Sequence, residues 1–168
     1  LNLNQTLSLN HSNLFMGNQI LISKDKVIIS ANQYTYILDI NNGSIIYKVN
    51  FSSLLKPFVL NDYLFLITKN NLLVSFNLKN GKIIYSYDVN QKIAKFLNTK
   101  KKNVKFKELA LVNDKIFIFL KNSYVLKFNI NGELEKISKL PSKLNTQPIF
   151  INNSMIYLDY KNKISVVD

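Results

Sequence analysis

Residues 24–50 of the chain read KDKVIISANQYTYILDINNGSIIYKVN, and residues 113–139 read NDKIFIFLKNSYVLKFNINGELEKISK. Each segment opens on a polar dipeptide that ends in Asp, continues through two apolar runs, and reaches an Asn-Gly turn before a last run. Residues 61–88 follow the same plan, and residues 152–168 follow its first half. Because self-similarity at a fixed spacing is the signature of repeat architectures, we interpret the chain as four copies of one unit.

The spacing and the content of the copies define this unit. The opening turns are 37, 52 and 39 residues apart. The apolar runs of the first copy, rich in Ile, Val, Leu and Tyr, are residues 19–23, 27–30, 34–40 and 44–49. Asn-Asp and Asn-Gly between such runs favour tight hairpins, because Asn and Gly tolerate the positive φ of those turns. We therefore predict a four-stranded antiparallel sheet in each copy; only residues 91–100 have a helical period, which indicates a short helix.

The middle strands of a copy are apolar at nearly every position, as in residues 116–120, which read IFIFL. Such a strand has to be covered on both faces. Packing the sheets face to face around a common axis covers both faces and gives a β-propeller. A flat solenoid would also cover them, but its repeats are usually shorter and more regular. The predicted fold class is therefore all-β, a β-propeller of four-stranded antiparallel blades with about 3.75 blades present.

The predicted domain organisation follows from the repeat. A single partial propeller domain spans residues 1–168. The approximate blades are residues 11–50, 51–90, 104–140 and 145–168, and an insertion loop occupies residues 90–107.

The third strand of each copy ends in a pattern that resembles the PQQ-like, or quinoprotein-type, propeller repeat. In that family an aliphatic-Asp pair ends the strand, a Gly follows four residues later, and usually a Trp four residues after that. The matching repeat anchors are Asp39, Gly43, Tyr47, Asn77, Gly81, Tyr85, Asn129 and Gly132. In the third copy the Gly comes one residue early and Lys136 stands at the aromatic position. We expect the anchors to be structural, with Gly closing a turn and the ring filling space between blades.

The resemblance covers residues 19–168 and implies a function in outline. The propeller lipoproteins of the bacterial outer-membrane β-barrel assembly machinery, the BamB group, are closest in character, because they use this repeat as an interaction scaffold. By that resemblance we expect a non-catalytic scaffold with a protein partner, such as an outer-membrane assembly component, at the periplasmic face of the outer membrane. Membrane association would come at most from a lipid anchor outside this chain.

The same resemblance leaves an enzymatic alternative open, namely a fragment of a PQQ-dependent dehydrogenase. Dehydrogenases of this superfamily need a ring of Asp, Glu and Asn ligands for calcium, and they typically add a vicinal disulfide and a Trp that stacks on the cofactor. This chain has three Glu, no Cys and no Trp. We therefore expect no catalytic residue, no cofactor and no metal in it.

The charge of the chain is a weak guide to its partner. The 22 basic residues are all Lys, the acidic residues number 10, and the formal net charge is +12. Without Arg there is no bidentate fork for guanine or phosphate. Because Asn occurs 25 times and Ile 20 times, the lysines are interpreted as compositional drift in an AT-rich genome, and we expect no specific nucleic-acid partner. Electrostatic binding of a polyanion through the lysines remains a second alternative.

Residues 90–107 interrupt the repeat and account for the 52-residue step. Such connections cross one face of a propeller near its central channel, where partners usually dock. We predict a loop that binds an acidic partner or an anionic membrane surface, with Leu97 adding apolar contact; the alternative is a tolerated surface insertion. The candidate binding residues are Lys95, Phe96, Lys100, Lys101, Lys102, Lys105, Phe106 and Lys107.

The last copy ends after its third strand. In closed propellers a strand from the other end of the chain completes such a blade and removes the open edge. Either residues 3–9 supply that strand or a preceding part of a longer protein does. We favour a C-terminal fragment of a longer propeller, because six to eight blades are usual in this family.

Overall fold

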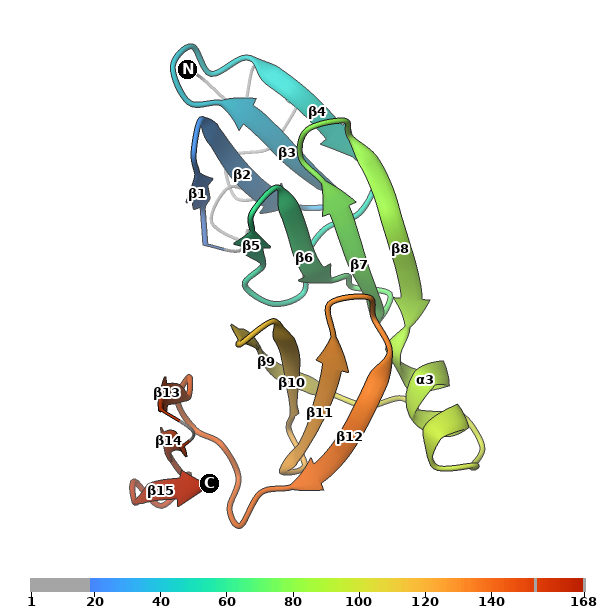
Figure 1. Ribbon diagram of the computed structural model, residues 1–168, viewed down its shortest axis with the longest axis vertical. Helices are drawn as coiled ribbons and strands as arrows, with labels where there is room; N and C mark the ends of the chain where they lie inside the picture. The colour runs from blue at the N-terminus through green and yellow to red at the C-terminus, as the bar shows by residue number, and fades with distance from the viewer. Residues whose placement is uncertain (1–18, 153, 168) are drawn as a thin grey trace. The chain divides into compact units, whose positions relative to one another are not determined.

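The computed structural model of the chain describes residues 19–152 and 154–167. Their strands form three four-stranded sheets and one three-stranded sheet, and consecutive strands are antiparallel neighbours (Figure 1). In the described residues, one helix, α3 (Val89–Phe96), lies between the strands β8 and β9. No helix of these residues is both long and apolar enough to cross a membrane. The all-β fold of four-stranded antiparallel units that the sequence predicts is confirmed.

The strands alternate with short turns along the chain. The first sheet contains β1 (Leu21–Ser23), β2 (Lys26–Ala31), β3 (Tyr34–Asp39) and β4 (Ile45–Val49). The second contains β5 (Phe58–Leu60), β6 (Tyr63–Ile67), β7 (Leu72–Asn77) and β8 (Lys82–Asp88). The third contains β9 (Phe106–Val112), β10 (Lys115–Leu120), β11 (Tyr124–Asn129) and β12 (Leu134–Lys139). The fourth contains β13 (Ile149–Ile151), β14 (Ser154–Leu158) and β15 (Ile164–Val167).

The chain divides into two compact units, Leu1–Ser86 and Tyr87–Asp168. The first unit holds the first and second sheets, apart from the end of β8, and the second unit holds α3 with the third and fourth sheets. Residues 3–9, which the sequence offers as a closing strand, and the first residues of the predicted blade 11–50 lie outside the described residues. In the described part of the chain, β15 is an edge strand of the fourth sheet.

The first two sheets pack on each other through one hydrophobic core. Ile28 and Ile37 of the first sheet are buried against Leu64, Leu66, Val74 and Phe76 of the second sheet and Leu78 of the turn after β7. A second buried cluster on the first sheet includes Ile29 and Tyr36. Since side chains alternate between the faces of a strand, neighbours such as Tyr36 and Ile37 point to opposite faces, so β3 is buried on both.

The second unit is built in the same way. Its core contains Phe119 and Val125 from the third sheet and Met155 and Tyr157 from the fourth, and Leu140 and Leu144 between the two sheets complete it. Phe119 is fully buried. Sheet therefore packs on sheet within each unit, as apolar strands require.

The turn after the third strand repeats in three sheets and explains the polar anchors. The side-chain oxygens of Asp39, Asn77 and Asn129 accept hydrogen bonds from backbone N–H groups of the following turn, at 2.8 to 3.3 Å. The glycines of these turns have φ of 71°, 69° and 79°; they are Gly43, Gly81 and Gly132. Side-chain caps and left-handed glycines are what a tight turn requires, so the anchors have structural roles.

Tyr47 joins the first sheet to the second. A Cβ atom added to Gly81 would lie only 2.5 Å from Cε1 of the Tyr47 ring. The Tyr47 hydroxyl donates to the carbonyl of Lys79 at 2.8 Å, and the ring meets Phe76 edge to face with centroids 5.9 Å apart. The aromatic side chain of one sheet thus docks on the glycine turn of the next, where only a hydrogen side chain leaves room.

Asp62 makes a polar link across the same two sheets. Its Oδ1 lies 2.8 Å from Nζ of Lys24, which belongs to the turn between β1 and β2, and its Oδ2 lies 2.9 Å from Nζ of Lys79. The hydrogen bonds from these two ammonium groups lower the pKa of Asp62 to about 2. Because both lysines are exposed, solvent screens this link and its contribution to stability is small.

We expect the stability contribution of Asp62 to depend on pH. A lowered pKa in the folded state adds stability above the ordinary value of 3.8, and this stability is lost as the pH falls from there toward 2. Unfolding of the chain and of Asp62→Asn should therefore differ at pH 6 and converge near pH 2. A titration of the Asp62 carboxyl carbon by NMR measures the pKa directly. A midpoint that stays the same after Lys24→Met and Lys79→Met would contradict the assignment.

Candidate partner-binding site

Helix α3 begins where the long strand β8 ends. Asp88 is its N-cap, and the Asp88 side chain accepts a hydrogen bond from the N–H of Gln91 at 3.1 Å. Asp is a preferred N-cap residue because its carboxylate satisfies a free N–H of the first turn. Val89, Asn90 and Ala94 form the buried face of the helix. The sequence therefore predicts a helix here correctly, although its range of 91–100 begins and ends later than α3.

The helix packs against β12, the edge strand of the third sheet on the side opposite β9. Figure 1 shows α3 beside β12 at the end of β8. The N-cap at Asp88 starts the helix directly at the end of a fourth strand. The expected crossing of the insertion near a central channel stays a prediction.

Three polar contacts hold the segment that follows the helix. The buried side chain of Asn90 accepts a hydrogen bond from the N–H of Val104 at 3.0 Å. The ammonium group of Lys101 lies 2.5 Å from Asp88 Oδ2, and the carbonyl of Lys105 accepts a hydrogen bond from the N–H of Lys121 at 2.8 Å. These contacts fix residues 97–105 near the middle and at the C-terminal end.

The carboxylate of Asp88 contacts both the start of the helix and Lys101. Partial burial acts to raise the pKa of Asp88, but the hydrogen bonds from Lys101 and from the N–H of Gln91 outweigh it, so the pKa is lowered. The carboxylate therefore stays charged at neutral pH and serves both as the helix cap and as the partner of Lys101.

The exposed part of the segment combines apolar and positively charged side chains. Phe96 and Leu97, at the end of the helix, are 48% and 51% exposed. Four exposed lysines flank them in the sequence, and none of the four forms an ion pair with another residue of the described ranges. We call these six residues the α3 surface: Lys95, Phe96, Leu97, Lys100, Lys102 and Lys105.

Three residues predicted for the binding loop are not part of the α3 surface, because they are buried or contact other residues of the chain. Phe106 is only 5% exposed and pairs with Leu120 in the third sheet, so its ring is not available to a partner. Lys107, also in β9, is half-buried, and its ammonium group lies 5.7 Å from the ring centroid of Tyr160. Lys101 is engaged by Asp88. The predicted loop 90–107 is therefore a helix, a fixed connection and the start of a strand.

Sequence reasoning did not find Asp88 and Asn90, which position the connection. The signal for Asp88 was present, because an Asp three residues before Gln91 at the start of a helical period is a capping pattern. Nothing in the sequence pointed to Asn90. In the described ranges, no group of three or more His, Cys, Asp or Glu side chains could hold a metal ion.

No protein-family model matches the chain, and no curated protein matches it. Solved structures do match. BamB from Moraxella catarrhalis has a TM-score of 0.55 at 12% identity, over 89% of this chain and 56% of its own. The computationally designed Ika4 protein has a TM-score of 0.63 at 13% identity, over 88% of both chains. The quinohemoprotein alcohol dehydrogenase ADHIIG from Pseudomonas putida HK5 has a TM-score of 0.56 at 14% identity, over 76% of this chain and 22% of its own.

The fold is that of a β-propeller. The four sheets are its blades, and the likeness to BamB and to the quinohemoprotein alcohol dehydrogenase is a likeness of fold. Identities of this size show the fold alone. The chain spans little more than half the length of the BamB structure.

Proposed function

We propose that this chain is a non-catalytic β-propeller scaffold that binds an acidic protein partner through the α3 surface. The observation that carries the proposal is the exposure of Phe96 and Leu97 on a helix end that polar contacts hold in place. Exposed apolar side chains within a charged rim are typical of protein interfaces. The flanking lysines would attract an acidic partner and orient it during encounter.

The compartment and the partner class are part of the same proposal and rest on the likeness to BamB. We propose an outer-membrane assembly component as the partner and the periplasmic face of the outer membrane as the location. The reading frame upstream of Leu1 tests both: a signal peptide with a lipidated Cys and further repeats would support the proposal. An upstream frame that encodes neither would remove the compartment but leave the scaffold role standing.

The enzymatic alternative draws on the likeness to a quinohemoprotein alcohol dehydrogenase, which matches this chain over 22% of its own length. A fragment of that kind would carry its cofactor residues in another part of the protein. The exposed apolar side chains of Phe96 and Leu97 on the α3 surface favour the scaffold instead. A ligand ring for calcium and a stacking Trp encoded upstream would favour the enzyme.

Charge reversal on the α3 surface should weaken partner capture while the fold stays intact. We expect Lys100→Glu/Lys102→Glu to lower capture of the partner at least tenfold, because two attractions become repulsions; tenfold corresponds to about 1.4 kcal/mol. Lys101 is left unchanged, since a Glu there would face Asp88. The measurement is quantitative mass spectrometry of proteins retained by the immobilised chain from a lysate of the source cell.

Matched variants separate the surface from net charge. Lys56→Glu/Lys143→Glu changes two exposed lysines outside the α3 surface and should retain the partner. Phe96→Ser/Leu97→Ser removes the apolar part alone and should also lose it. Equal capture by all variants at equal thermal stability would eliminate the α3 surface as the binding site. Retention on heparin that both charge variants weaken equally would favour the polyanion alternative.

A further inference from the structure

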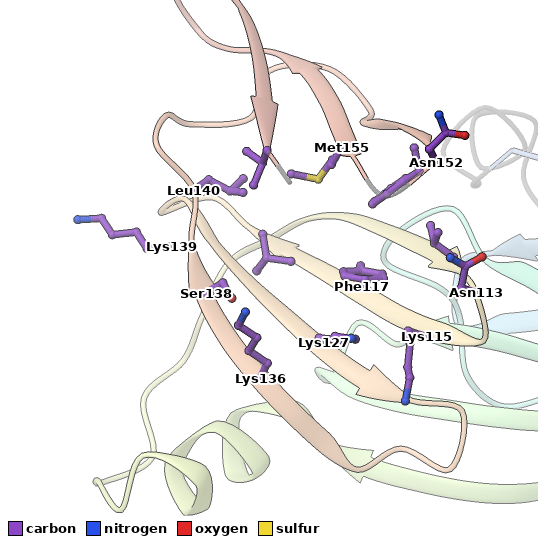
Figure 2. A pocket seen from close by; sticks show the side chains of 14 residues that line it. Asn113, Lys115, Phe117, Lys127, Lys136, Ser138, Lys139, Leu140, Asn152 and Met155 are labelled. Atoms are coloured by element: carbon purple, nitrogen blue, oxygen red, sulfur yellow. The ribbon is translucent and has the colours of Figure 1, made fainter.

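A cavity of about 400 Å³ lies between the third and fourth sheets of the second unit (Figure 2). Its size falls within the range of about 300–1,000 Å³ that small-molecule sites occupy. The apolar side chains that line it come from both sheets, and they include Phe117, Phe150, Met155 and Val167. The rings of Phe117 and Phe150, with centroids 5.5 Å apart, connect the two sheets across this space.

Four lysines also line the cavity, and they differ in their ion pairs and in the direction of their side chains. Lys115 forms an ion pair with Glu135, and Lys139 points away from the other lining side chains (Figure 2). Lys127 on β11 and Lys136 on β12 are direct cross-strand neighbours. Neither Lys127 nor Lys136 forms an ion pair within the described residues; Lys127 is half-buried and Lys136 is exposed.

The strand registers show where these two lysines stand in the repeat. In the first sheet, Ile28, Ile37 and Tyr47 lie opposite one another across β2, β3 and β4. In the third sheet, Phe117, Lys127 and Lys136 form the equivalent row across β10, β11 and β12. In the first sheet, Ile37 and Tyr47 of this row pack against the second sheet. In the third sheet, the equivalent positions are Lys127 and Lys136, which line the cavity between the third and fourth sheets.

Two facing lysines are unfavourable for the chain alone. Like charges directly opposite each other on adjacent strands are destabilising. An ammonium group that loses hydration is compensated well by a hydrogen-bonded anion. Each lysine offers up to three N–H donors, so one carboxylate can accept from both.

We propose that this cavity is a binding site for a small amphiphilic carboxylate, an anion with one carboxylate and a short aliphatic tail. The carboxylate would lie between the ammonium groups of Lys127 and Lys136, and the tail would lie against Phe117, Phe150 and Met155. The site is separate from the α3 surface, and it does not depend on the partner proposed for that surface.

Octanoate is the probe, and the methyl group of Met155 is the reporter. The chain has two Met, so a sample labelled with ¹³C at the Met methyl group gives two resonances, which Met16→Leu assigns. We expect saturable movement of the Met155 resonance with octanoate, at least tenfold weaker binding in Lys127→Gln/Lys136→Gln, and binding within twofold of the original in Lys139→Gln. Octanol, which has the tail without the charge, should bind at least tenfold more weakly, and raised salt should weaken octanoate alone.

Three results would overturn the proposal. One is a Met155 resonance that does not move with octanoate while the protein stays folded. Another is unchanged octanoate affinity in the double Gln variant, which would assign the binding to the apolar walls alone. Loss of binding in Lys139→Gln to the same extent as in the double variant would likewise mean a general charge effect and not a site. Partner capture by the α3 surface is not affected by any of these outcomes.

Discussion

We expect Gly81→Ala to lower the free energy of unfolding by about 2–4 kcal/mol. Part of this loss, about 1–2 kcal/mol, comes from placing an Ala at φ +69°, where L residues are strained. The rest comes from overpacking, since the new Cβ would approach Cε1 of Tyr47 to 2.5 Å and force the ring out of its position.

Chemical denaturation followed by far-UV circular dichroism measures this loss, because the chain has no Trp to report by fluorescence. The matched control is Lys82→Ala at the next residue, the first of β8, which is exposed and should change stability by less than about 0.5 kcal/mol. A Gly81→Ala protein as stable as this control would mean that Tyr47 does not dock on the turn.

The second large effect is expected from Phe76→Ala, which should cost about 3–5 kcal/mol. Phe76 is fully buried. The rings of Tyr47, from β4, and of Phe51, from the connection after β4, meet it edge to face at centroid distances of 5.9 and 6.3 Å. Truncation leaves a cavity at the centre of the core between the two sheets, and two rings lose their partner at once.

The same denaturation experiment tests Phe76 against a surface residue of the same sheet. Ile83 in β8 is 53% exposed, so Ile83→Ala should cost less than about 1 kcal/mol. Similar costs for Phe76→Ala and Ile83→Ala would show that β7 does not carry a buried face toward the first sheet.

The fold could be predicted from the sequence because the same pattern of turns and apolar runs occurs in three copies. Asn-Gly turns and apolar runs recur in phase, and errors in one copy are corrected by the others. The two-sided burial of β6, where Leu64, Phe65, Leu66 and Ile67 are all buried, follows from a run with no polar residue.

Less of the candidate site could be predicted, and the reasons are local. Phe106 stands between Lys105 and Lys107, and that alternation belongs to a half-buried strand, but the lysine run before it suggested a loop. The register of the third sheet shifts between Lys127 and Phe128, so spacing along the chain did not reveal that Lys127 faces Lys136. The docking of Tyr47 on Gly81 depends on contact between sheets, which no spacing within a copy specifies.

The central claim is that the two sheets of a unit pack face to face, and that in the first unit Tyr47 of the first sheet lies on the glycine turn of the second. A double-mutant cycle on Tyr47 and Gly81 tests it most directly, because it measures the energy shared by two residues 34 positions apart on different sheets. We predict that Gly81→Ala costs about 2–4 kcal/mol in the original chain but about 1–2 kcal/mol in the Tyr47→Ala background, a coupling of at least about 1 kcal/mol. An equal cost in both backgrounds would contradict the packing described here.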